Sequence, residues 1–155
     1  MIRGPHIRRL IRSLPLWLPL LAAAPQQVDW RAIGQVGGPT QAVAVQGRYA
    51  YVGVGLRMVI LDVSNPPELQ EAGVTRPFPH FVEDVAVRDT LAYVAAGAGG
   101  LRVVNVSNPA SPVEIGAWES PGYAEGVAVA GNILYLAGGS YGLRAIDVSN
   151  PSRPM

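Results

Sequence analysis

The chain contains no cysteine and no lysine. Without cysteine it has no disulfide, no thiolate nucleophile and no cysteine-ligated metal site. Without lysine it has no Walker-type phosphate loop, because that loop places a lysine on the nucleotide phosphates. Charged residues make up only 15% of the chain and hydrophobic residues 49%, which is too apolar for a disordered protein. The composition therefore indicates a folded, cysteine-free protein.

Acidic residues are missing from the N-terminal segment, where arginines are concentrated. Four arginines (Arg3, Arg8, Arg9 and Arg12) lie before residue 13 and contribute to the formal net charge of +1. From residue 25 onward, eight arginines face eleven acidic residues, a net charge of −3. A mildly acidic protein without a basic cluster lacks the electrostatic footprint of nucleic-acid binding. We therefore expect no nucleic-acid partner.

The first 24 residues have the features of an export signal. The arginines lead into an apolar run from Leu14 to Ala24, which is too short to span a bilayer comfortably. The run ends in the small residues that a signal peptidase needs, although Pro25 disfavours cleavage directly before it. We predict a signal peptide or an uncleaved N-terminal anchor over residues 1–24; an upstream start assigned in error is the alternative. The protein is expected to be exported, to the periplasm, the cell surface or the exterior, with no stable membrane span unless the signal stays uncleaved.

A unit of 42 or 43 residues recurs three times in the chain. Its anchors are a valine, a tyrosine and a proline that return in register: Val43, Val85 and Val127; Tyr51, Tyr93 and Tyr135; Pro66, Pro109 and Pro151. The 18 glycines and 14 prolines also recur at fixed points, so they mark turns. The period is that of a four-stranded propeller blade.

Each unit alternates short apolar runs with turns. The third copy predicts strands over 125–129, 133–137 and 143–148, ended by a Ser-Asn-Pro turn. The first two copies continue into a fourth strand, over 69–74 and 113–118. Trp30–Val36 resembles that fourth strand, with Ala32-Ile-Gly-Gln-Val against Val113-Glu-Ile-Gly-Ala.

The third strand of each unit is apolar on both faces. Met58 and Ile60 alternate with Val59 and Leu61. Such strands are covered on both sides, which favours stacked blades over an ordinary two-layer sandwich. We therefore predict an all-β fold of propeller-type blades with four antiparallel strands, over residues 25–155. The three repeats would cover about 28–68, 69–112 and 113–154.

The third strands also carry a resemblance to a known family. Met58-Val-Ile-Leu-Asp62, Leu101-Arg-Val-Val-Asn105 and Leu143-Arg-Ala-Ile-Asp147, each followed by Val-Ser-Asn-Pro, resemble the LVIVD repeat of bacteria and archaea. The resemblance covers residues 30 to 154 and implies a β-propeller in an exported or cell-surface protein. The family has no generally assigned catalytic activity, so the resemblance implies no catalytic residues. Asn105 departs from the motif, which has aspartate there.

The number of repeats leaves two interpretations open. Closed propellers typically have about four to eight blades, and this sequence has three. The chain is either a fragment of a longer propeller protein or a homo-oligomer, for example two three-blade arcs that close a six-blade ring. In both cases, three blades alone leave faces and strand edges that invite association.

Asp62 and Asp147 end two of the apolar strands just before the Ser-Asn-Pro turn. A ring of carboxylates for a cation is one interpretation, but calcium needs about six to eight closely packed oxygens, and Asn105 interrupts the series. We predict instead that these side chains accept hydrogen bonds from N–H groups of the following turn. No metal and no cofactor is expected.

The candidate binding residues lie near the starts of the first strands. Gln41, Glu83 and Glu125 occupy equivalent positions there and could line the mouth of a central channel. The neighbouring loops add large side chains suited to a binding surface: His80, Phe81, Tyr123 and Tyr141. We predict that these residues bind an unknown protein or glycan ligand. The alternative is that they are solvated loop residues, with the aromatic rings packed between blades.

Hydrolytic catalysis has little support in the sequence. From residue 25 onward His80 is the only histidine, and a Ser–His–Asp set would need Ser120 or Ser140 beside it. The sequence therefore predicts a non-enzymatic, adhesion-like binding or scaffolding module. The alternative is a piece of a larger propeller enzyme whose site needs further blades.

Overall fold

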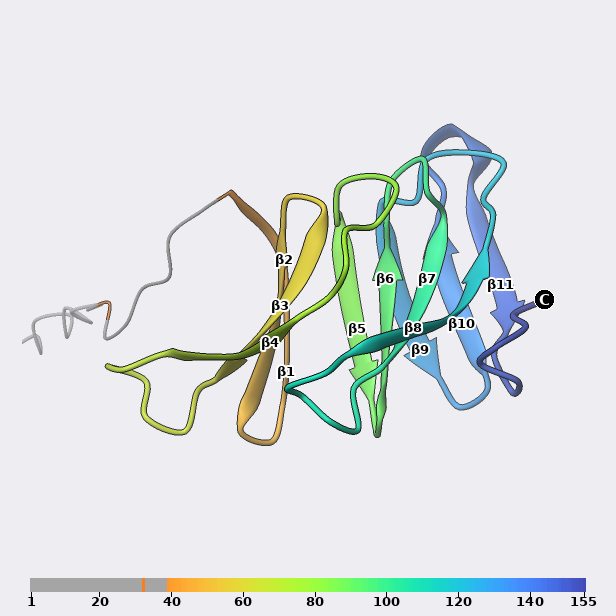
Figure 1. Ribbon diagram of the computed structural model, residues 1–155. Coiled ribbons are helices and arrows are strands. Elements are labelled where there is room, and N and C mark those ends of the chain that lie inside the picture. Colours follow the sequence, from red (N-terminus) through yellow and green to blue (C-terminus); the bar gives the residue numbers. More distant parts are fainter. Residues whose placement is uncertain (1–31, 33–38) are drawn as a thin grey trace, which may run out of the picture. The chain divides into compact units, whose positions relative to one another are not determined.

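The computed structural model of the protein describes Ala32 and residues 39–155, which form strands joined by short turns (Figure 1). The predicted leader and most of the strand predicted at Trp30–Val36 lie outside the described residues. The strands are β1 (Thr40–Gln46), β2 (Tyr49–Val54), β3 (Arg57–Asp62), β4 (Gln70–Val74), β5 (Asp84–Arg88), β6 (Leu91–Ala95), β7 (Leu101–Asn105), β8 (Val113–Trp118), β9 (Gly126–Ala130), β10 (Ile133–Ala137) and β11 (Leu143–Asp147). One short 3₁₀ helix, η1, covers Gly139–Tyr141.

These strands form three antiparallel sheets in which each strand pairs with its neighbours in sequence. Blade A is β1-β2-β3-β4, blade B is β5-β6-β7-β8, and blade C is β9-β10-β11. The predicted all-β fold of antiparallel blades is confirmed, with four strands in blades A and B and three in blade C among the described residues. Strands β8 and β10 have the bounds that the sequence predicts. Each complete sheet ends on its fourth strand, whereas the repeat limits drawn on the sequence place that strand first.

The first hairpin of each blade turns at a residue with positive φ. These residues are Gly47 (φ 61°), Asp89 (φ 55°) and Gly131 (φ 57°). Glycine adopts this left-handed region without steric cost, and aspartate is among the few other residues that tolerate it. The three hairpins therefore repeat one backbone geometry although blade B has a different residue.

The Ser-Asn-Pro turns are capped as predicted. Asp62 and Asp147 accept the N–H groups of Ser64 and Ser149 at 3.0 and 2.8 Å, and Asn105 accepts that of Ser107 at 2.9 Å. An amide oxygen serves as well as a carboxylate here, which explains why Asn105 is compatible with the repeat. Asp62 also pairs with Arg48, and these hydrogen bonds hold the pKa of its carboxyl below the ordinary value.

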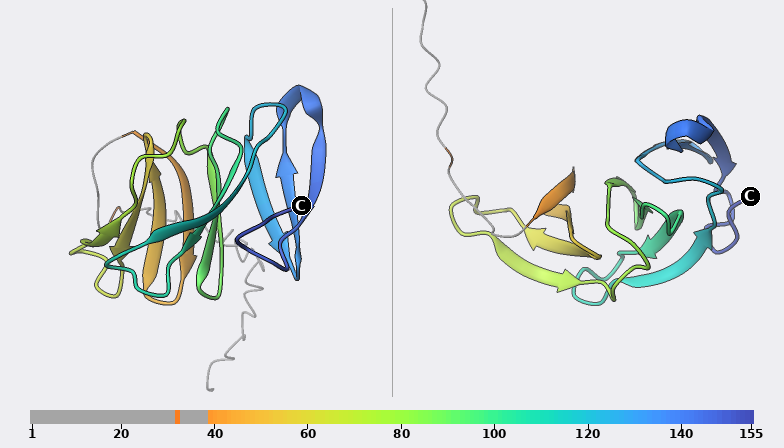
Figure 2. Two further views of the ribbon diagram at one scale, coloured as in Figure 1. Left: turned by 45° about the vertical axis from the view of Figure 1, so that its right-hand side comes forward. Right: turned by 90° about the horizontal axis from the view of Figure 1, so that it is seen from above.

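The three sheets of residues 39–155 lie face to face in sequence order, with β1 beside β5 and β5 beside β9 (Figure 2). Blade B is covered on both faces. Val94 and Val104 pack against blade A, Tyr93 and Val103 pack against blade C, and all four are 0% exposed. This arrangement explains why the strands are apolar at both parities, as the sequence indicates.

Two features bring neighbouring blades into close contact. The fourth strand of each complete blade passes over the next blade's Ser-Asn-Pro turn: a Cβ added to Gly73 or Gly116 would overlap the carbonyl oxygen of Pro109 or Pro151. The first strands are tied by Asp84, whose Oδ2 accepts the N–H of Val127 at 2.9 Å. Among the described residues no helix is long and apolar enough to cross a membrane.

Candidate functional site

The candidate binding residues lie at the end of the blades where the first strands begin, which is the upper end in Figure 1. His80, Phe81 and Glu83 belong to the connection from β4 to β5. Tyr123 and Glu125 belong to the connection from β8 to β9, and Tyr141 ends η1. We call these six residues the loop-end cluster. It draws on blades B and C and on the loop that enters blade B.

Hydrogen bonds and ring contacts join the centre of the loop-end cluster. The hydroxyl of Tyr123 donates to Glu83 Oε1 at 2.6 Å and lies 3.3 Å from His80 Nδ1. The ring of His80 meets the rings of Phe81 and Tyr123 edge to face, with centroids 5.6 and 5.2 Å apart. Tyr123 is about forty residues from its partners in sequence, so the contact exists only because blade C stacks on blade B.

The two outer members are positioned by glycines. A Cβ on Gly122 would overlap Tyr141 Cδ2, so the ring of Tyr141 lies directly on the backbone next to Tyr123. A Cβ on Gly139 would lie 2.8 Å from Glu125 Oε1, which places that carboxylate over the start of η1. No described side-chain contact joins Gln41 to the cluster, although Gln41 is exposed at the same end of blade A.

Gly97 lies against the side chains of His80 and Tyr123, a contact that the sequence did not suggest. Its φ is 49°, and an added Cβ would lie 2.5 Å from His80 Nδ1 and 2.8 Å from Tyr123 Cζ. The Gly-rich segment 97–100 forms the connection from β6 to β7. The contact of Gly97 with the rings of His80 and Tyr123 depends on how loops from different blades stack, and a local sequence pattern does not show this.

The carboxylates of the loop-end cluster change the acidity of Tyr123, one of its two tyrosines. The pKa of Tyr123 is raised above its ordinary value, first by the hydrogen bond to Glu83, then by partial burial and by the negative charges of Glu83 and Glu125. Each effect favours the neutral phenol over the phenolate.

We expect Glu83→Gln to lower the pKa of Tyr123, because the variant removes the charged acceptor. The shift is measured by a pH titration of tyrosine-labelled protein followed by NMR. The Tyr123→Phe variant assigns the signal of Tyr123. Glu68→Gln, a change in a distant turn, should leave the pKa of Tyr123 unaltered. An unchanged pKa in Glu83→Gln would contradict the hydrogen bond.

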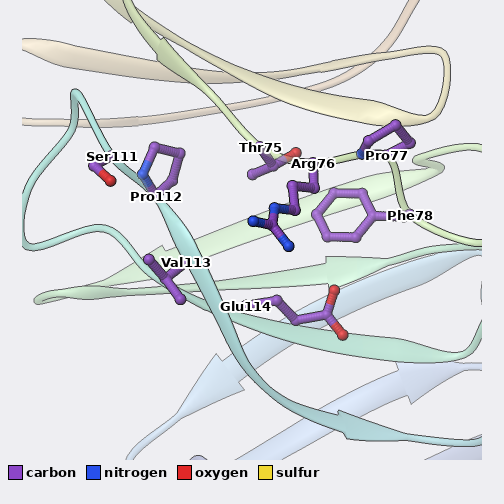
Figure 3. A pocket seen from close by; sticks show the side chains of 8 residues that line it. All are labelled: Thr75, Arg76, Pro77, Phe78, Ser111, Pro112, Val113 and Glu114. Carbon is purple, nitrogen blue, oxygen red and sulfur yellow. The ribbon is translucent and has the colours of Figure 1, made fainter.

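A separate cavity of about 530 Å³ lies between the connection that leaves β4 and the turn that enters β8. Figure 3 shows Arg76 and Glu114 pointing into it beside Phe78. Glu114 already faces Arg102, with 3.4 Å between Oε1 and Nη1. The lining of the cavity therefore includes one arginine, two prolines and one carboxylate that already faces Arg102, and it does not include any member of the loop-end cluster.

The described residues supply no hydrolytic constellation around His80. Ser120 Oγ accepts the N–H of Gly122 at 3.3 Å, and no described contact joins Ser140 to His80. Ser140 lies in the run Gly138-Gly-Ser-Tyr-Gly142, which has the spacing of a nucleophile elbow. Here the run forms a 3₁₀ turn between two antiparallel strands, whereas the elbow requires a strand followed by a helix. Among the described residues no group of three or more histidines, aspartates or glutamates could hold a metal ion.

Comparison with known protein families confirms the predicted repeat. The profile of the family described as LVIVD repeat matches residues 37–75, 81–119 and 121–155. The chain belongs to the LVIVD repeat family. Each match of this LVIVD repeat chain spans the strands of one blade, including Asn105 in the second.

Two solved structures are similar to the LVIVD repeat chain in fold. The computationally designed Ika4 protein has a TM-score of 0.66 at 13% identity, over 83% of this chain and 78% of Ika4. The computationally designed Ika8 protein has a TM-score of 0.60 at 14% identity, over 70% of this chain and 33% of Ika8. These likenesses support the propeller-type fold. No curated protein matches the chain.

Proposed function

We propose that the protein is a non-enzymatic binding module, exported or held at the cell surface, whose loop-end cluster binds a cationic segment of a partner protein. The observation that carries the proposal is the exposure of aromatic rings beside two carboxylates. Tyr141 is 55% exposed, Phe81 51% and Tyr123 38%, and Glu83 and Glu125 lie among them. Rings next to carboxylates attract ammonium and guanidinium groups by cation–π and charge-assisted contacts.

The charge of the protein supports this choice of ligand. Residues 39–155 contain seven arginines and ten acidic residues, a net charge of −3. A ligand of opposite sign is steered towards an acidic surface, and an acidic ligand is repelled. The stacked blades hold the loops in place, as expected for a recognition surface built on a rigid scaffold. Export is proposed from the N-terminal segment of the sequence.

The proposal of a non-enzymatic role rests on the partners of His80. Its described contacts are with the rings of Phe81 and Tyr123 and with the Tyr123 hydroxyl, and that hydroxyl donates to a carboxylate. This is a network of neighbours that orient one another, without a nucleophile beside the imidazole.

The test is an NMR titration of the ¹⁵N-labelled full chain with the peptide acetyl-Arg-Gly-Arg-amide. We expect amide shifts confined to residues near 80–84, 122–126 and 139–142, and no such shifts with acetyl-Glu-Gly-Glu-amide. Glu83→Gln should weaken binding by about five-fold, the equivalent of ~1 kcal/mol for a lost charge contact. Glu68→Gln is the matched control and should bind as the wild type does. Equal responses to both peptides, or equal affinities of both variants, would refute the proposal.

A further inference from the structure

Blade C has an open edge on its last strand. In blade B, Asn105 of β7 pairs with Val113, which begins the fourth strand. In blade C, Asp147 of β11 exchanges two backbone hydrogen bonds with Met155, of 2.6 and 3.0 Å, at the corresponding place. Among the described residues no strand pairs with the outer edge of β11 from Leu143 to Ile146. This row of unpaired N–H and C=O groups is a template for a further strand.

Blade C also has an open apolar face. Tyr93 and Leu101 of blade B are 0% exposed because blade C covers them. Their counterparts Tyr135 and Leu143 in blade C are 40% and 69% exposed, and Ile133 beside them is 36% exposed. The same side chains that form the B–C interface are thus repeated on a surface that nothing covers among the described residues, which is the mark of an interaction surface.

Residues 31–36 carry the sequence pattern of a fourth strand. Aligned on a shared Ile-Gly pair, Ile33-Gly34 corresponds to Ile115-Gly116 of β8. That glycine has a physical reason, because in both complete blades the fourth-strand glycine lies against the carbonyl of the next blade's Ser-Asn-Pro turn. Blade A already contains its own fourth strand, β4, so residues 31–36 are surplus to it.

The open edge is too far away for residues 31–36 of the same chain. Between Val36 and the start of β1 at Thr40, the backbone can span at most about 14 Å. Blade B lies between blades A and C (Figure 2). With stacked sheets roughly 10 Å apart, two steps separate blade A from blade C, a distance of about 20 Å.

We propose that a second copy of the chain completes blade C. Residues 32–36 of the second copy pair with β11 of the first, next to the place that Met155 occupies, and blade A of the second copy stacks on the open face of blade C of the first. The first copy makes the same contacts with the second. The added strand uses backbone hydrogen bonds for pairing and repeats the B–C packing for its side chains. Two such contacts related by a two-fold axis close a ring of six blades, within the range of about four to eight that closed propellers use. This association does not depend on ligand binding at the loop-end cluster.

The first test is the mass of the full chain in solution, by light scattering after size exclusion. A discrete species of twice the chain mass of 16.4 kDa is expected. A monomer, or a polydisperse series of larger assemblies, overturns the proposal.

The second test is a disulfide between copies, which the absence of native cysteine makes clean. Arg102 pairs with Ala117 in blade B, so Arg144 is expected to pair with Gln35 of the second copy. Mixing Gln35→Cys with Arg144→Cys under oxidation should give a disulfide-linked dimer. Mixing Gln35→Cys with Arg102→Cys is the matched control and should give little, because Ala117 already occupies that place. Equal cross-linking in the two mixtures overturns the proposed register.

The third test separates association from folding. Leu143→Asp places a charge on a side chain that is exposed in one copy and buried in the proposed dimer, so the fold should persist and the dissociation constant should rise at least about 100-fold. Val113→Asp, at an exposed apolar side chain of blade B, a blade that takes no part in the proposed contact between copies, is the control and should leave the dimer intact. A Leu143→Asp variant that remains as dimeric as the control overturns the proposed interface.

Discussion

Replacing Tyr93 by alanine is expected to lower the free energy of unfolding by about 3–5 kcal/mol, as for other large aromatic truncations in a core. Tyr93 is 0% exposed and lies in the cluster between blades B and C, where it packs with side chains of both sheets. Its loss would leave a cavity at an interface that cannot collapse without moving a whole blade. Thermal unfolding followed by circular dichroism should show a midpoint lower by about 10 °C or more.

Replacing Tyr93 by phenylalanine, in contrast, should not lower the free energy of unfolding. The Tyr93 hydroxyl is buried and has no hydrogen-bond partner among the described residues. Tyr93→Phe keeps the ring and removes an unpaired polar group, so its stability should equal or exceed that of the wild type. A loss of more than about 1 kcal/mol in Tyr93→Phe would contradict this prediction, because it would show that the Tyr93 hydroxyl makes a stabilising hydrogen bond.

Replacing Gly116 by alanine is expected to cost about 3 kcal/mol or more, at the upper end for overpacking. The added methyl group would overlap the carbonyl oxygen of Pro151, a backbone atom that cannot rotate away as a flexible side chain can. Strand β8 would have to move away from the third Ser-Asn-Pro turn, and the contact between blades B and C would open. Denaturant unfolding measures the loss as a lower midpoint.

Gly126→Ala is the matched control for that variant. Gly126 also lies in a strand, but an added Cβ there would meet Ala137 Cβ at 3.5 Å and Asp84 Oδ2 at 3.8 Å, which are ordinary contacts. This change should be neutral or stabilise the protein by about 0.5 kcal/mol, because alanine restricts the unfolded chain. Comparable losses in Gly116→Ala and Gly126→Ala would show that the close approach to Pro151 does not limit the packing.

The sequence names the chemistry of the loop-end cluster but not its contacts. The recurrence of the repeat predicts that Glu83 and Glu125 lie at equivalent strand starts, and it treats Gln41 as a third equivalent. The contacts between these side chains depend on how the loops that enter neighbouring blades pack against each other. Tyr123, in the loop that enters blade C, reaches back to Glu83, whereas no described side-chain contact brings Gln41 to the cluster.

The sequence by itself determines the strands, the turns and the repeat, because each depends on residues close together in the chain. The bounds of β8 and β10 and the capping by Asp62 and Asp147 are of this kind. Only the tertiary structure decides how equivalent residues differ. Tyr93 is buried and Tyr135 is 40% exposed although both hold the same place in the repeat. The reason is that burial of a blade face depends on a neighbouring blade, which is a contact between segments some forty residues apart and leaves no mark in the local pattern.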